Sequence, residues 1–313
     1  MSTKFTQLLS ALCLLAGGVS AAERHETYEW LVGDSPIIKV DTFKGSIRVE
    51  TAQSGRVELE LAATAMDENA SRWLDKILVK ANPFGAGVVL TVKQDGWGVE
   101  FGAGTAPQRR IDLVLRVPKQ CTLDLKSEAG NIEVADDIQG NLRARVSTGD
   151  IYFGRVSGSV TALTRMGNLI VSHATGDLTA RSYHGDLHVG TVMGWADLRA
   201  DHGNIQVTNS YGGLSAHAIK GDIKAGMSRK ISADASLKVS AGDIFVDVDP
   251  ESAFVIDARS SWGKVDSALD FASSESKASP TRLNGARNGG GALLALKASG
   301  GDVHIKSVPT YGF

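Results

Sequence analysis

Glycine followed by Asp or Asn is a recurring pattern in this chain, and its carboxylate and amide oxygens could bind a metal ion. Gly185 precedes Asp186, and Gly-Asp or Gly-Asn pairs recur every 18 residues, with one interval of 19 and one of 21. A second series of glycines falls midway between them. Calcium-binding β-rolls also repeat Gly and Asp every nine residues, so bound calcium is one interpretation.

A structural role for these turns is the other interpretation. The chain lacks the G-G-x-G-x-D phrase of calcium β-rolls, and Asn alternates with Asp until Asp222 and Asp243. That alternation avoids repulsion between like charges on neighbouring strands. Glycine supplies the positive φ of a tight corner, and Asp or Asn hydrogen-bonds its own backbone there. The residues assigned to structural turns are Gly130, Gly149, Asp150, Gly167, Gly185, Asp186, Gly203, Gly221, Asp222, Gly242 and Asp243.

Two histidines are the candidates for a transition-metal site. His184 and His202 each precede a glycine of the first series, so they should lie one above the other, near Asp186 and Asp201. Imidazole and carboxylate groups are common zinc ligands. No third histidine shares their column. Two stacked surface imidazoles are therefore the favoured interpretation, and neither a metal nor another cofactor is expected.

Basic side chains form one outward column of the repeat, interrupted by Leu163. Guanidinium groups bind carboxylates and phosphates through paired hydrogen bonds, so the column could bind an anionic glycan or lipid headgroups. A solvated face neutralised by Asp197 and Asp201 is the alternative. The basic residues of this column are Arg145, Arg181, Arg199 and His217.

Aromatic side chains could serve as platforms on which a sugar stacks. The candidates are Trp97, Phe101, Trp195 and Trp262. Trp195 is of most interest, because it replaces Asp in a turn and should be exposed. Ordinary packing is the alternative.

Enzymatic motifs such as G-x-S-x-G, H-E-x-x-H, C-x-x-C and the phosphate-binding loop do not occur. Glycoside hydrolysis needs two carboxylates gathered at one bond, whereas the charges here are distributed along columns. We predict no enzymatic activity and no catalytic residues. A polysaccharide-active enzyme is the less favoured alternative.

The elements that position these residues follow from alternation of apolar and polar residues. After Gly185, Leu187 and Val189 alternate with Asp186 and His188, which indicates a strand with one buried face. Two strands and two turns in 18 residues make one coil of a β-solenoid, whose equivalent positions stack about 4.8 Å apart. Positions two and four residues after each glycine are apolar in every coil, so they form the core.

We therefore predict an all-β protein: a single-stranded parallel β-solenoid, or β-helix, with 18-residue coils of two strands. The general crossover preference favours a right-handed coil, and one short helix is expected within Met66–Lys76. Residues 22–125 should form strands and the helix that cap the solenoid. Residues 126–308 should form the repeat, with a long exposed loop at 267–291, followed by a tail at 309–313.

Residues 1–21 are typical of a signal peptide, with Lys4, an apolar stretch of about a dozen residues, and small residues before the expected cleavage after Ala21. No stretch is long and apolar enough for a transmembrane helix. Without this leader, 32 basic residues face 35 acidic ones, which argues against a nucleic-acid partner. Cys121 is then the one remaining cysteine, so no intramolecular disulfide is expected.

Several stretches carry a resemblance to a known family. They are "KGSIRVE", "RIDLVLRVP", "LDLKSEAGNIEV", the repeated "GDI" turns and "GGALLALKASGGDVHI". With them the chain resembles the DUF4097 family of exported bacterial β-solenoid proteins, described as candidate adhesins. The resemblance implies a solenoid fold, a location in the periplasm or at the cell surface, and adhesion. It implies no catalytic residues.

These observations together predict a non-enzymatic protein of the cell envelope that binds a partner. The expected partner is an anionic glycan or an envelope protein. A sensor or regulator of envelope stress, acting through a membrane protein, is an alternative function. Self-association through the ends of the solenoid is a further expectation.

Overall fold

The computed structural model describes residues 21–52, 55–66, 69–95, 109–227, 231–272 and 279–308. The chain divides into two compact units between Tyr152 and Phe153. Within each unit nearly all regular elements are β-strands, which form two sheets, and the one helix of the described residues is α1 (Ala70–Asp75). The predicted all-β class with one short helix is confirmed.

The first unit has five strands in each of its two sheets. One sheet has the order β1 (Ala21–Leu31), β4 (Arg56–Met66), β7 (Arg109–Pro118), β3 (Ser46–Ala52) and β9 (Ile132–Val134). The other has the order β5 (Ile77–Phe84), β6 (Gly87–Gln94), β2 (Ile37–Thr42), β8 (Thr122–Ala129) and β10 (Leu142–Thr148). The outer pairs β1–β4, β4–β7 and β5–β6 are antiparallel, and the inner pairs are parallel.

Helix α1 is held against β1 by a partly buried arginine. Arg24 donates hydrogen bonds to the carbonyl oxygens of Leu74 and Ile77, at 2.7 and 2.8 Å, and pairs with buried Glu26. Trp73 and Leu74 of the helix are buried. The helix lies inside the predicted segment Met66–Lys76. Among the described residues, no helix has the length and apolar character needed to cross a membrane.

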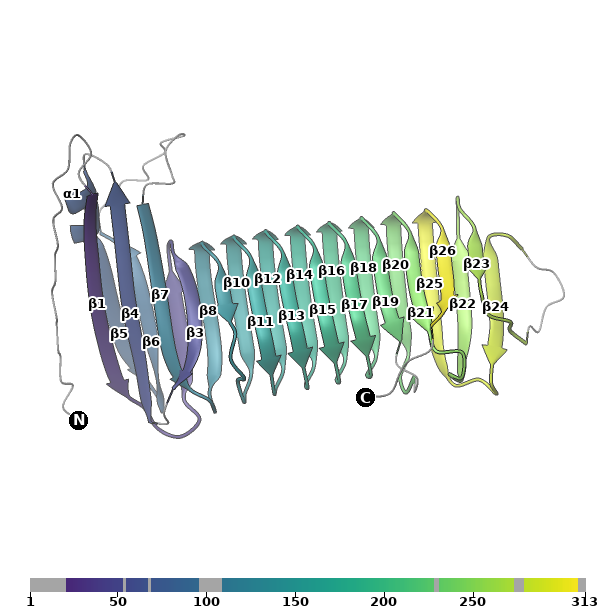
Figure 1. Ribbon diagram of the computed structural model, residues 1–313, viewed down its shortest axis with the longest axis horizontal. Coiled ribbons are helices and arrows are strands. Elements are labelled where there is room, and N and C mark those ends of the chain that lie inside the picture. The colour runs from purple at the N-terminus through teal and green to yellow at the C-terminus, as the bar shows by residue number, and fades with distance from the viewer. Residues whose placement is uncertain are drawn as a thin grey trace. The chain divides into compact units, whose positions relative to one another are not determined.

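The second unit is a stack of two-strand coils, in which each coil gives one strand to each sheet (Figure 1). β11 (Ile151–Val156) spans the division between the units. One sheet has the order β13 (Leu169–Ala174), β15 (Leu187–Val192), β17 (Ile205–Ser210), β19 (Ile223–Met227), β21 (Ile244–Val248), β26 (Val303–Ser307) and β23 (Val265–Ser267). The other has the order β12 (Val160–Met166), β14 (Leu178–His184), β16 (Ala196–His202), β18 (Leu214–Lys220), β20 (Ala235–Ala241), β25 (Ala292–Gly300), β22 (Phe254–Ser260) and β24 (Arg282–Arg287).

The core columns are confirmed by the register of the parallel strands. Leu187 lies opposite Leu169 on one side and Ile205 on the other, and all three are fully buried. On the facing wall Leu198 lies between Ala180 and Ala216. Ala196 of the same strand lies between Leu178 and Leu214, so this coil exchanges the large and the small position and keeps the filled volume of the interior.

The coil made of β25 and β26 comes last in the sequence, but it is not the last coil of the stack. β25 pairs with β20 on one side and with the earlier strand β22 on the other, and β26 likewise lies between β21 and β23. Leu294 is consequently opposite both Ala235 and Ile256. In the first unit β2 lies between β6 and β8 in the same manner. At these places the order of strands in the sheets therefore differs from their order in the sequence.

The predicted loop at 267–291 is also wrong in part. Residues 282–287 form β24, which pairs antiparallel with β22. Arg287 anchors the segment by donating to the carbonyl oxygens of Pro250 and Asp270, at 2.8 Å in each case. A single edge strand that buries little carries a weak apolar signal, so its Gly, Asn and Arg residues look like a loop.

Candidate functional site

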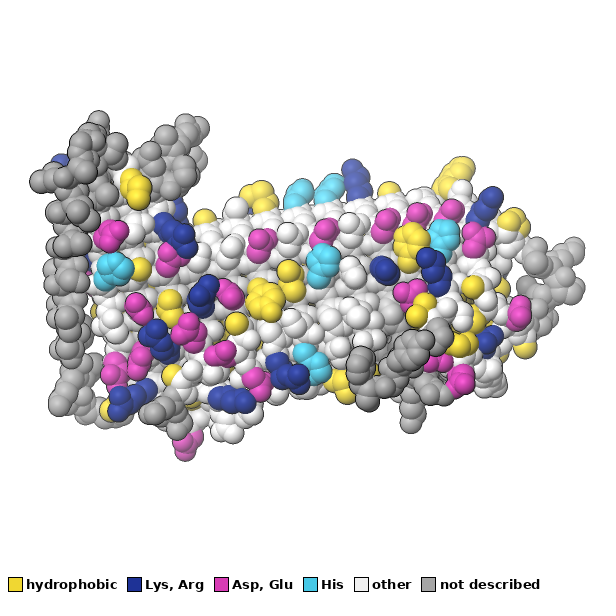
Figure 2. All heavy atoms as spheres, viewed as in Figure 1, with side chains coloured by type: hydrophobic (Ala, Val, Ile, Leu, Met, Phe, Trp, Pro, Cys, Tyr) yellow, Lys and Arg dark blue, Asp and Glu magenta, His cyan; other side chains and the backbone are white. Residues whose placement is uncertain are grey.

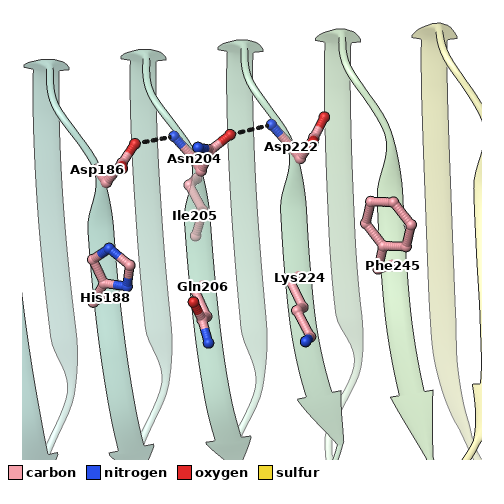
Figure 3. A pocket seen from close by; sticks show the side chains of 8 residues that line it. All are labelled: Asp186, His188, Asn204, Ile205, Gln206, Asp222, Lys224 and Phe245. Atoms are coloured by element: carbon pink, nitrogen blue, oxygen red, sulfur yellow. Dashed lines mark hydrogen bonds between the residues drawn. The ribbon is translucent and has the colours of Figure 1, made fainter.

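The Gly-Asx turns form a ladder of side-chain hydrogen bonds that runs from each coil to the next. We call Asp186, Asn204, Asp222, Asp243 and Asp302 the Asx ladder. Asp186 Oδ1 accepts from the backbone N–H of Asn204 at 2.7 Å, and Asn204 Oδ1 accepts from the N–H of Asp222 at 2.9 Å (Figure 3). The ladder continues through Asp243 to Asp302. The expectation that each side chain bonds its own turn is therefore wrong, because the donor lies one coil away. An amide oxygen serves as well as a carboxylate oxygen, so Asn and Asp both fit.

Acidic side chains form a row on one face of the second unit. Figure 2 shows acidic side chains set in a row across the coils of the second unit, closest together towards its C-terminal coils. This matches the ladder, in which Asn separates Asp186 from Asp222, whereas Asp222, Asp243 and Asp302 follow on consecutive coils.

Glycines of the two series can differ in backbone conformation, as Gly221 and Gly212 show. All first-series glycines have positive φ, as expected; at Gly221, for example, φ is 134°. Second-series Gly212 is not among the positive-φ residues, but a Cβ there would meet the carbonyl oxygen of Gly194 in the preceding coil. The same close approach occurs at Gly221, where a Cβ would meet the carbonyl oxygen of Gly203, so the near contact of two backbones requires glycine in both corners.

The two candidate metal-binding histidines are stacked on each other. The imidazole rings of His184 and His202 lie with centroids 4.9 Å apart and planes 3° from parallel. Their column continues to Met166 on one side and Lys220 on the other. Within the part of the chain that the structure describes, no group of three or more His, Cys, Asp or Glu side chains is placed to hold a metal ion.

The basic column runs along the second unit in register. Arg181 lies opposite Arg199, and Arg199 lies opposite His217. The column continues on strands where the sequence analysis assigned no site: His217 is opposite Lys238, which is opposite Lys297. It ends on β22 and β24 with Arg259 and Arg282. We call Arg181, Arg199, His217, Lys238, Lys297, Arg259 and Arg282 the cationic ladder.

A sequence signal for most of the missed residues exists. Arg181 stands four residues before Gly185, and Lys238, Lys297 and Arg259 stand four residues before Gly242, Gly301 and Gly263 in the same way. Arg282 has no such glycine, because its strand is antiparallel. Arg145 belongs to the first unit, where it lies opposite Lys126.

Three carboxylates flank the cationic ladder. Asp197 lies 4.0 Å from Arg181 Nη2 and 3.9 Å from Arg199 Nε, distances at which solvent-exposed pairs contribute little. Asp201 lies two residues beyond Arg199 on β16. With Asp257, three carboxylates therefore face six permanently charged cations, which leaves an excess of three positive charges.

The C-terminal end of the cationic ladder is partly neutralised. Arg259 donates two hydrogen bonds to Asp257, at 2.8 and 2.6 Å, and these hold the pKa of that carboxyl below its ordinary value. Lys238 and Lys297 are exposed and make no ion pair among the described residues. The centre of the cationic ladder is thus its most available part.

The candidate tryptophans differ in their surroundings. A Cβ at Gly213 would meet the ring of Trp195, so this ring lies against the backbone of the next coil. Its backbone N–H donates to Asp177 Oδ1 at 2.9 Å. Trp262 is 89% exposed. Trp97 and Phe101 lie outside the described residues.

A groove crosses the opposite sheet of the second unit, between the Asx ladder and the next outward column. Its volume is about 250 Å³. Asp186, Asn204 and Asp222 form one side, and the other side is formed by His188, Gln206, Lys224 and Phe245 (Figure 3). Gln206, Lys224 and Phe245 are not among the site residues predicted from the sequence.

The sequence matches the model of a known protein family over most of its length. Residues 37–306 match the model of the family described as Toastrack DUF4097. The fold is similar to the structure of a candidate lipid-binding protein from Parabacteroides distasonis, at 13% identity over 90% of this chain and 97% of that one, with a TM-score of 0.48. A candidate adhesin from Bacteroides fragilis is 13% identical over the same shares, with a TM-score of 0.45. No curated protein matches the sequence.

Proposed function

Because the chain belongs to the Toastrack family DUF4097, we propose that it is a non-enzymatic binding protein that presents a rigid β-solenoid to its partner. We place it outside the cytoplasm, in the periplasm or at the cell surface, where residues 1–21 would direct it. The partner that we propose is an anionic glycan of the cell envelope.

The cationic ladder is the observation that carries this proposal. From Arg181 to Arg259 its members occupy one column of parallel strands, so their positions repeat at about the 4.8 Å spacing of adjacent strands. A linear polymer that carries acidic groups at intervals could meet several of these cations at once. Guanidinium groups at Arg181 and Arg199 suit carboxylate or sulfate groups, to which they can donate two hydrogen bonds each.

The rigidity of the scaffold favours such binding. The strands from β14 to β22 are each hydrogen-bonded to a neighbour on both sides, and side chains on their inner face, such as Leu237, are buried. Little backbone ordering is therefore needed when the ligand binds, and ordering is one of the main costs of association.

The test is to measure binding of the full chain to polygalacturonate, with dextran as the neutral polymer. We expect binding to polygalacturonate that weakens as salt is raised, since exposed charges are screened. Reversing two central charges, Lys238→Glu with Lys297→Glu, should weaken binding about tenfold or more, equivalent to about 1.4 kcal/mol. Both residues are exposed, so the stability of the fold should change little.

A matched variant separates the cationic ladder from net charge. Arg155→Glu with Lys306→Glu makes the same change of charge on exposed residues of the other sheet. It should reduce binding much less. Equal loss in both double variants, or equal binding of dextran and polygalacturonate, would contradict the proposal. Binding to anionic vesicles but not to polygalacturonate would point to a lipid surface instead.

A further inference from the structure

The Asx ladder contains more charge than its structural role needs. Asn204 accepts the N–H of Asp222 with one amide oxygen, and Asp186 accepts the N–H of Asn204 with one carboxylate oxygen. The second oxygen of Asp186, and that of Asp222, is not used by these bonds. Both residues line the groove. This side of the groove therefore offers a carboxylate, an amide and a carboxylate on three consecutive coils.

The other side of the groove offers hydrogen-bond donors. His188, Gln206 and Lys224 lie in register on β15, β17 and β19, two residues beyond the Asx position of each coil. They are exposed. Positions two residues apart along a strand are about 7 Å apart, so a ligand lying along the groove would meet both rows at once.

An aromatic ring closes one end of the groove. One face of Phe245 stacks on His304, with ring centroids 5.0 Å apart and planes 14° from parallel. Phe245 also lines the groove, on the strand next to that of Lys224 (Figure 3). His188 lies at the other end, three coils away, which corresponds to about 14 Å.

We propose that this groove binds a short segment of a neutral saccharide. A hydroxyl group both donates and accepts hydrogen bonds, so one hydroxyl can donate to Asp186 or Asp222 while another accepts from Gln206 or Lys224. The apolar C–H face of a sugar ring packs on Phe245, and aromatic side chains with a few placed polar groups are typical of ligand sites.

The charges of the groove select against other ligands. An anionic ligand meets Asp186 and Asp222, and a cationic ligand meets Lys224. A purely apolar ligand leaves the two rows of polar groups without partners, which costs free energy. The groove lies on the opposite sheet from the cationic ladder, so this inference does not depend on the proposed binding of an anionic glycan.

The experiment measures binding of cellotriose, maltotriose and tri-N-acetylchitotriose to the full chain by saturation-transfer NMR and calorimetry. We expect at least one of them to bind. Phe245→Ala and Gln206→Ala should each weaken that binding about tenfold or more. Asp222→Asn keeps the oxygen that accepts the N–H of Asp243 and removes one repulsion between like charges. It should therefore not lower the thermal midpoint, and it should still weaken binding several-fold.

Two control variants define the site. Tyr183→Ala removes an exposed aromatic side chain from the other sheet and should leave saccharide binding unchanged. The Lys238→Glu/Lys297→Glu variant should also bind the saccharide as the wild type does, whatever its effect on anionic polymers. Absence of binding by all three trisaccharides overturns the inference. So does binding that survives Phe245→Ala and Gln206→Ala unchanged.

Discussion

Asp186 Oδ1 accepts a hydrogen bond of 2.7 Å from the backbone N–H of Asn204, its counterpart one coil further on. The bond links equivalent corners of two coils and not two ends of one turn. The corner N–H groups of Asn204, Asp222, Asp243 and Asp302 all donate to a side-chain oxygen of the preceding coil in this way. The repeat of Asp and Asn in the sequence is thus a device for stacking coils.

Replacing the acceptor tests this role directly. Asp186→Asn retains an oxygen at the same position and should leave the free energy of unfolding nearly unchanged. Asp186→Ala leaves the N–H of Asn204 without its side-chain acceptor and should cost about 0.5–1.5 kcal/mol. Urea denaturation of the two variants measures the difference. Equal destabilisation by Asn and Ala would contradict the ladder.

Like charges on consecutive coils should be a source of instability. Asp243 lies between Asp222 and Asp302 in the Asx ladder. Asp243→Asn keeps the oxygen that accepts the N–H of Asp302 and removes the repulsion, so it should raise the free energy of unfolding by a few tenths of a kcal/mol. The gain should shrink in high salt, because exposed charges are screened. A gain that is independent of salt would assign it to another cause.

Inward and outward positions of one strand should respond oppositely to a charge. Leu187 is fully buried, and its neighbour His188 is exposed. Leu187→Asp places a carboxylate in the core without a partner and should abolish folding, whereas Leu187→Ala should cost about 2–5 kcal/mol. His188→Asp should change stability by no more than about 0.5 kcal/mol. Circular dichroism and denaturant titration distinguish these outcomes, and comparable damage at both positions would refute the assignment.

Removal of divalent metal should not affect the fold. The side-chain oxygens of the corners, such as Asp186 Oδ1 and Asn204 Oδ1, accept backbone N–H groups, so their role in the stack needs no cation. The thermal midpoint should therefore be the same with and without EDTA. A midpoint that falls in EDTA and recovers with added calcium would restore the β-roll interpretation.

The core could be predicted from the sequence because equivalent positions recur at a fixed interval. A period of 18 places Leu169, Leu187 and Ile205 in one column, and the alternation within each strand identifies which side is buried. This information is local, so it needs no knowledge of distant contacts. The stacked histidines followed from the same interval.

The rest depended on contacts between distant segments. Lys297 joins the cationic ladder across 59 residues from Lys238, and Arg282 joins it through an antiparallel pair. No fixed interval predicts either pairing. The groove was missed for a different reason: Phe245 interrupts a column of polar residues, and its ring becomes meaningful once the register places it beside Lys224.

The intercalated coil β25–β26 makes the order of synthesis matter for how the second unit is completed. Strands β22 and β23 leave the ribosome before the strands that join them to β20 and β21 exist. Until the C-terminal coil arrives, two strand edges stand open on each sheet, and open edges are where β-proteins pair wrongly. Insertion of β25 and β26 closes these edges, and the chain is most exposed to aggregation before that insertion.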